Sequence, residues 1–278
     1  MYSANFDYHR PSTVDEAVAL LVRYGDDAKL LAGGQSLIPA MKLRLATPKV
    51  IIDIGRVANL SYIRKSGDRI AVGAMTTHDE IAASALLAQS CPLLPETASH
   101  IGDVQVRNKG TIGGSLAHAD PAADWPATIL ALEAEVDVVG PRGRRTLRAD
   151  VFFVDLMQTA IAADEILCEI RVPTTSRSVA YVKTEQKASG FALAGVAVVV
   201  GPAGVRVGVT GVAAKAYRAT AVERALAARP FTVEAIARAA AHAAEDVDAL
   251  GDIHASPEFR VHLAQVNTQR ALTRAVAR

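Results

Sequence analysis

The sequence predicts an α+β fold made of several subdomains, and three observations support this prediction. The chain has 278 residues, which is long for a single compact core. Half of its residues are hydrophobic, which is enough to build a core. Strand-like and helix-like runs are mixed up to about residue 175, whereas three strand-like runs followed by Ala-rich helices make up the rest. We therefore expect subdomains over 1–56, 57–175 and 176–278.

The first subdomain is predicted to begin with a strand, a helix and a second strand. Thr13 and Glu16 form a capping-box pattern ahead of apolar residues at helical spacing, and Gly25 ends this predicted helix. The runs AKLLA and KVIIDI predict buried strands. Between them, IPAMKLRL predicts a short helix with Pro39 in its first turn.

The second subdomain is predicted to mix hairpins and helices. The sequence SGD at 66–68 separates two alternating runs, which is typical of a hairpin. Thr77 and Glu80 repeat the capping-box pattern, and PAADWPATILALEA predicts a helix that begins near Pro121. A hairpin around 140–143 and the strand DEILCEIRVP complete this subdomain.

The third subdomain is predicted to be a sheet covered by helices. Its strand-like runs lie at 179–186, 191–200 and 205–212. The last helix is expected to begin with Ser256 as N-cap and Pro257 as its first residue.

Composition excludes several function classes. The formal net charge is +1, so the sequence has no basic footprint for nucleic acid. Its longest apolar run, 191–205, is interrupted by Gly201 and Pro202, and we expect no integral membrane segment. No secretory signal is recognisable, which favours a cytoplasmic location. The two cysteines, Cys91 and Cys168, are too few for a four-cysteine cluster.

Two Gly-Gly pairs each follow a strand-like run and precede a helix-like one, in LLAGGQSL and TIGGSLAH. One explanation is a tight turn at positive φ, which glycine adopts at little cost. The other is close approach of bare backbone to a ligand, with N–H groups directed at a phosphate. Neither the P-loop pattern nor G-x-G-x-x-G occurs, so a diphosphate cofactor here would indicate a less common flavin fold.

Four stretches of the sequence resemble a known protein family. The stretches AGGQSLIPAMKLRLATP, TIGGSLAHADPAADWPA, ADEILCEIRVP and ASPEFRVHLAQV resemble the FAD-binding medium subunit of molybdenum hydroxylases, the xanthine dehydrogenase family, especially the carbon monoxide dehydrogenase type. The resemblance implies a two-part FAD-binding region of the p-cresol methylhydroxylase type. It also implies a C-terminal α+β domain with a three-stranded antiparallel sheet and helices.

The resemblance assigns cofactor contacts to this sequence. The first loop would be formed by Leu31, Ala32, Gly33, Gly34, Gln35, Ser36 and Leu37, and the second by Thr111, Ile112, Gly113, Gly114 and Ser115. Both loops would hold the diphosphate and adjacent sugar through backbone N–H groups and short hydroxyls. Ile101 and Gly102 would lie along the cofactor, and His118 is a weaker candidate for contact.

Three further residues match family positions but have ordinary alternatives. Asp124 would hydrogen-bond cofactor hydroxyls, or simply cap a helix. Leu167 would pack on the isoalloxazine ring, or belong to the core. Lys183 would lie near the flavin ring and stabilise its reduced, anionic form, or be a solvated strand lysine.

The resemblance implies an electron-transfer subunit of a heterotrimer. A large subunit would carry the molybdenum cofactor, and a small subunit would carry two [2Fe–2S] clusters and supply electrons to FAD. The complex would be a dimer of heterotrimers that reduces an external acceptor. The alternatives are a stand-alone FAD oxidase of the same broad fold and a flavin-free assembly scaffold.

Overall fold

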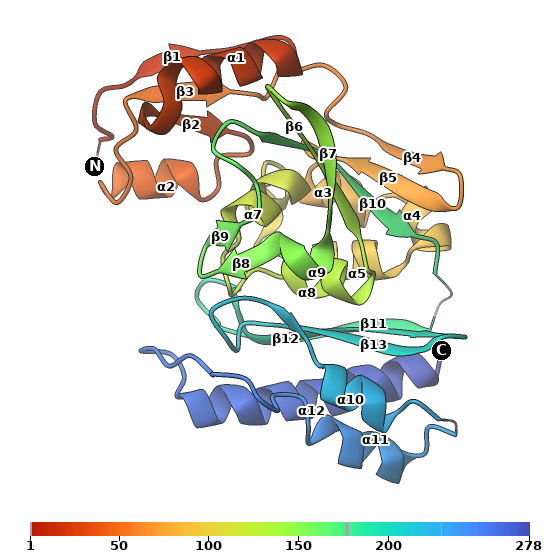
Figure 1. Cartoon of the computed structure of the whole chain (residues 1–278). Helices are drawn as coiled ribbons and strands as arrows, with labels where there is room; N and C mark the ends of the chain where they lie inside the picture. Colours follow the sequence, from red (N-terminus) through yellow and green to blue (C-terminus); the bar gives the residue numbers. More distant parts are fainter. Residues whose placement is uncertain (1, 176–177, 229) are drawn as a thin grey trace.

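The computed structural model describes residues 2–175, 178–228 and 230–278, and its sheets and helices form successive layers (Figure 1). The N-terminal layer is a parallel sheet in the order β1-β3-β2, made of β1 (Asp7–His9), β2 (Ala28–Leu31) and β3 (Val50–Asp53). Helix α1 (Val14–Tyr24) packs on this sheet, and the short helix α2 (Leu37–Lys42) follows β2. Strand β1 lies before α1, where the sequence predicts a strand.

The central layer is an antiparallel five-stranded sheet in the order β4-β5-β10-β6-β7. Its strands are β4 (Ile63–Ser66), β5 (Arg69–Gly73), β6 (Glu135–Gly140), β7 (Gly143–Arg148) and β10 (Ile166–Pro173). Ile166 and Cys168 of β10 share a hydrophobic cluster with α1 and β3, so the N-terminal unit rests on one face of this sheet. Both predicted hairpins and the closing strand are confirmed.

Short helices cover the other face of the central sheet. They are α3 (His78–Ala82), α4 (Ala85–Ser90), α5 (Leu93–Ser99), α6 (Val104–Arg107), α7 (Ile112–His118), α8 (Trp125–Ala131) and α9 (Ala149–Phe152). A two-stranded sheet, β8 (Phe153–Asp155) with β9 (Gln158–Thr159), follows α9. The predicted capping box of Thr77 and Glu80 is present at α3. Helix α8 begins at Trp125 rather than near Pro121, because residues 121–123 hydrogen-bond to the C-terminal sheet instead.

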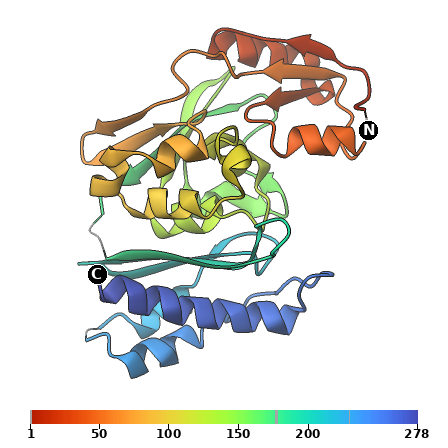
Figure 2. The same cartoon turned by 180° about the vertical axis from the view of Figure 1, so that it is seen from behind.

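The C-terminal layer is an antiparallel sheet of β11 (Val179–Glu185), β12 (Ala192–Gly201), β13 (Gly204–Thr210) and the two-residue β14 (Tyr217–Arg218). The three predicted strands are confirmed, and β14 is an addition at the edge. One face shares a hydrophobic cluster with α5 and α8, and the other packs on α10 (Thr220–Ala225), α11 (Val233–Ala240) and α12 (Pro257–Val276). Figure 2, which views the molecule from behind, shows that α12 runs along the C-terminal sheet. Among the described residues, no helix combines the length and apolarity needed to cross a membrane.

Candidate functional site

The first glycine loop presents a row of free backbone donors. It joins β2 to α2, and the N–H groups of residues 32–37 donate to no acceptor within the parts of the chain that the structure describes. Ser36 stands at the N-cap of α2 without a side-chain capping bond, and Gln35 is exposed. Consecutive N–H groups of this kind favour an anionic ligand such as a phosphate.

The second glycine loop is built differently. The N–H groups of residues 112–115 all donate to oxygens of the chain itself, on Ala74, Thr76 and Thr111. Thr111 caps α7, since its Oγ1 accepts from the Gly114 N–H at 3.1 Å. The cofactor contact expected for residues 111–115 stays a prediction, but the N–H groups of residues 112–115 already donate within the chain. Capping and the contact with residues 74–76 already use those donors.

The glycines hold the two loops side by side. A Cβ on Gly33 would overlap the carbonyl oxygen of Lys109 and lie 2.8 Å from its carbon. A Cβ on Gly114 would lie 2.8 Å from Oγ1 of Thr111 and at an ordinary contact distance of 3.4 Å from the Cβ of Ala32. The missing side chain of Gly33 thus lets the first loop contact the segment that leads into α7.

At Gly34 and Gly113, the need for a glycine is explained by backbone conformation and by close packing, respectively. Gly34 has φ of +74°, so the positive-φ explanation applies to it. A Cβ on Gly113 would lie 2.7 Å from the carbonyl oxygen of Ala74, which leaves no room for a side chain. All four glycines are therefore explained by close packing or backbone conformation within the chain.

A buried histidine supports the second loop. His78 is 4% exposed, and its Nδ1 accepts from the indole N–H of Trp125 at 3.1 Å. Its backbone N–H donates to the carbonyl of Gly110 at 3.0 Å, directly before Thr111. Burial lowers the pKa of His78 to about 4, with a smaller contribution from Arg107, so the ring is neutral near pH 7. Sequence reasoning missed this role because the partners are distant in the chain.

Asp124 lies in a buried polar cluster. It is 5% exposed and accepts a hydrogen bond from the hydroxyl of Tyr181, while Nζ of Lys183 lies 3.0 Å from its Oδ1. Asp124 stands at the N-cap position of α8, but its side chain makes no capping bond to that helix. Burial raises the pKa of Asp124 to about 6, against the opposing effects of Lys183 and Tyr181.

Lys183 is not a solvated strand residue. Its side chain is 1% exposed, and its ammonium also donates to the carbonyl oxygens of His100 at 2.6 Å and Gly190 at 2.7 Å. A Cβ on Gly190 would lie 3.6 Å from the Cα of Gly102, so the segment that contains Ile101 and Gly102 borders the turn before β12. A contact of Lys183 with a flavin ring stays a prediction.

The remaining candidates surround the second loop. Leu167 is 5% exposed and belongs to the hydrophobic cluster that includes Ile112, which agrees with its core alternative. Ile101 is partly buried against the same cluster. His118 is the last residue of α7 and partly buried. Flavin contacts of all three stay predictions.

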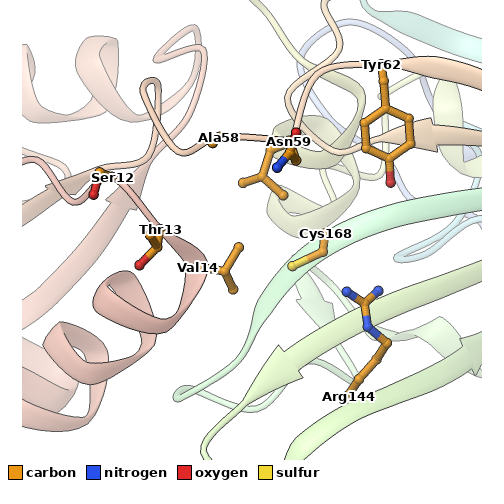
Figure 3. A pocket seen from close by; sticks show the side chains of 9 residues that line it. Ser12, Thr13, Val14, Ala58, Asn59, Tyr62, Arg144 and Cys168 are labelled. Carbon is orange, nitrogen blue, oxygen red and sulfur yellow. The ribbon is translucent and has the colours of Figure 1, made fainter.

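A cavity of about 290 Å³ lies elsewhere, between the start of α1 and the central sheet (Figure 3). It is lined by Ser12, Thr13, Val14, Ala58, Asn59, Leu60, Tyr62, Arg144 and Cys168. None of the predicted cofactor residues lines it. Burial raises the pKa of Cys168 to about 11, so its thiol is protonated and unreactive at neutral pH.

Two family models together match nearly the whole chain. Residues 4–175 match the family described as "FAD binding domain in molybdopterin dehydrogenase", and residues 179–275 match "CO dehydrogenase flavoprotein C-terminal domain". The chain belongs to the FAD-binding medium subunits of the molybdenum hydroxylases. The resemblance seen in the sequence, the fold class and FAD as the family's cofactor are thereby confirmed.

Individual relatives cover the whole chain. The carbon monoxide dehydrogenase medium chain of Hydrogenophaga pseudoflava is 41% identical over 100% of this chain and 99% of its own. The nicotine 6-hydroxylase medium subunit of Paenarthrobacter nicotinovorans is 38% identical over 98% of this chain and 97% of its own. The solved carbon monoxide dehydrogenase of Hydrogenophaga pseudoflava that lacks the Mo-pyranopterin moiety superposes with a TM-score of 0.96 at 43% identity, covering 100% of this chain and 99% of that one.

Proposed function

We propose that this subunit is the electron-transfer component of a heterotrimeric molybdenum hydroxylase. It takes electrons from [2Fe–2S] clusters on a small subunit and passes them to an external acceptor, while a large subunit with the molybdenum cofactor oxidises the substrate. The observation that carries the proposal is the row of free N–H donors at residues 32–37, placed beside the second glycine loop in a chain of this family.

The residues present fit FAD. The N–H groups of residues 32–37 would bind its diphosphate, and the hydroxyls of Ser36 and Ser115 would hydrogen-bond the phosphates or sugar. The partly exposed face of the second loop would provide packing surface rather than N–H donors, and Asp124 would accept from a cofactor hydroxyl. Bound FAD supplies the ability to accept electrons and release them in another step.

The chain's own chemistry agrees with this division of labour. Its two cysteines are both buried, and no group of three or more His, Cys, Asp or Glu among the described residues is arranged to hold a metal ion. Relatives of comparable identity are named for carbon monoxide, nicotine and caffeine. We infer that substrate choice lies in the large subunit and not in this chain.

We further propose that the subdomain division is 1–56, 57–175 and 176–278, that the complex is a dimer of heterotrimers, and that it is cytoplasmic. The names of the relatives as medium chains and subunits support the multisubunit assembly.

The proposal is tested with the purified chain and with tagged chain from its own host. The isolated chain should bind FAD without a covalent bond, release it into the supernatant on acid precipitation, and turn over no organic substrate by itself. The tagged native chain should co-purify with a molybdenum subunit and an iron–sulfur subunit in equal amounts. Flavin retained in the precipitate, turnover by the chain alone, or native chain found without partners would each contradict the proposal.

A further inference from the structure

The C-terminal domain forms hydrogen bonds to the segment that connects α7 to α8. The N–H of Gly211 donates to the carbonyl of Pro121 at 2.7 Å, and the N–H of Ala192 donates to that of Ala122 at 3.1 Å. Thr210 Oγ1 lies 2.8 Å from the carbonyl oxygens of both Pro121 and Ala123. The backbone directly before Asp124 is thus fixed by residues from outside the part of the chain that matches the FAD-binding domain.

Tyr181 of β11 extends this hold to the Asp124 side chain. It is fully buried, and its hydroxyl donates to Asp124 Oδ1. Gly195 on β12 makes room for it, since a Cβ there would overlap the hydroxyl. Lys183 lies two residues further along β11, and its ammonium group contacts both oxygens of the same carboxylate.

We propose that Tyr181 is a positioning residue, whose hydroxyl holds the Asp124 carboxylate in the one orientation that accepts a hydrogen bond from the bound cofactor. This inference rests on the proposed function, because it assumes that Asp124 contacts FAD. It assigns to the C-terminal domain a part in cofactor binding that is exerted through Asp124, and not through a contact of Tyr181 with the cofactor.

The arrangement makes cofactor affinity sensitive to pH. The groups that act on Asp124 are Lys183 and Tyr181 in direct contact, with Glu185 as a weaker acidic neighbour; the ring of His100 packs edge-on against Tyr181. The hydroxyl of Tyr181 lowers the pKa of Asp124, so its removal should raise this pKa above about 6. A protonated carboxyl group loses acceptor capacity, so FAD affinity should decrease as the pH is lowered and Asp124 takes up a proton. In a variant without the Tyr181 hydroxyl, this decrease should begin at a higher pH than in the parent.

The test compares Tyr181→Phe with Tyr217→Phe in the full chain. Tyr217 is a matched control, because its hydroxyl donates to the carbonyl of Ala243 within the C-terminal domain at 3.1 Å and does not contact Asp124. FAD dissociation constants are measured by flavin fluorescence from pH 5 to pH 8.5. We expect Tyr181→Phe to weaken binding about 3- to 10-fold at neutral pH, the effect of one lost hydrogen bond. Its pH midpoint should move upward, whereas Tyr217→Phe should keep the parent's affinity and profile.

A double-mutant cycle with Asp124→Asn separates positioning from general stability. In the Asp124→Asn background, Tyr181→Phe should have little further effect on FAD affinity, and the pH dependence should be absent. Additive losses, an unshifted pH midpoint, or equal losses in both tyrosine variants would overturn the assignment. A parent chain that binds no FAD at any pH would instead overturn the proposed function, and the inference with it.

Discussion

At Gly33, the missing side chain makes room for protein backbone, because the site that a Cβ would occupy is filled by the carbonyl of Lys109. The sequence predicted that the glycines matter, but it offered a ligand or a positive φ as reasons. Only Gly34 fits the second reason. The packing reason could not be predicted, since Lys109 is remote in sequence and nothing local marks it as a neighbour.

Gly33→Ala should push the two glycine loops apart. The added methyl group cannot avoid the Lys109 carbonyl without a backbone shift, which should cost about 1–3 kcal/mol of stability and also weaken FAD binding. Gly201→Ala is the matched control, because a Cβ there meets nothing within 4 Å. Thermal unfolding of the flavin-free forms and FAD titration are measured together. Unchanged FAD affinity in Gly33→Ala would show that the loop contact does not shape the site.

His78 should make the chain less stable in acid. The unfolded chain takes up a proton on this residue below about pH 6.5, whereas the folded chain does so only near pH 4. The stabilising contribution of neutral His78 is therefore complete above pH 6.5 and lost as the pH falls toward 4, up to about 3 kcal/mol. Asp124, whose pKa is raised, acts in the opposite direction over part of this range.

The variant His78→Gln isolates this effect, because its amide oxygen can still accept from Trp125 and does not titrate. Urea unfolding at pH 7 and pH 4.5 is compared for parent and variant. The parent should lose more free energy of unfolding between these pH values than the variant does. Equal losses would mean that His78 is protonated in the folded chain.

Among the elements, those defined by local signals were predicted well. The helix beginning near Thr13, the capping box at α3, both hairpins and the long C-terminal strands all follow from patterns within a few residues. The predictions were incomplete or wrong where residues distant in the sequence determine the local structure. Helix α8 starts late because residues 121–123 bond to β12 and β13, and Asp124 pairs with Lys183 from another layer. The sequence identified both residues of that pair, but not that they meet.

Helix α7 should be sensitive to its N-cap. Thr111→Ala removes the oxygen that accepts from the Gly114 N–H and should cost about 1 kcal/mol. Thr232→Ala removes the equivalent bond to Ala235 at α11, far along the chain from the glycine loops. Both variants should lose similar thermal stability, but only Thr111→Ala should also weaken FAD binding. Parallel effects on FAD affinity would indicate that the cap acts only through overall stability.

In the whole molecule, the layers are joined by polar contacts as well as by a shared core. Glu96 of α5 accepts a hydrogen bond from the backbone N–H of Tyr181. It also forms ion pairs with Arg274 in the last turn of α12 and with Arg278, which follows this helix. Together with the bonds to residues 121–123, these contacts connect the FAD-binding part to the C-terminal sheet. Such extensive coupling argues that neither part opens without the other.

The chain should consequently unfold in one transition, and FAD should stabilise all of it. Trp125, the sole tryptophan, is fully buried in the FAD-binding part, so its fluorescence reports that region, while hydrogen exchange in α12 reports the C-terminal layer. Both probes should give the same urea midpoint. FAD at a hundredfold excess over its dissociation constant should add about 2.7 kcal/mol to the free energy of unfolding seen by each. If α12 opened at lower urea than the Trp125 region, or gained no protection from FAD, the C-terminal sheet would not be coupled to the cofactor site, and the role given to Tyr181 would lose its structural basis.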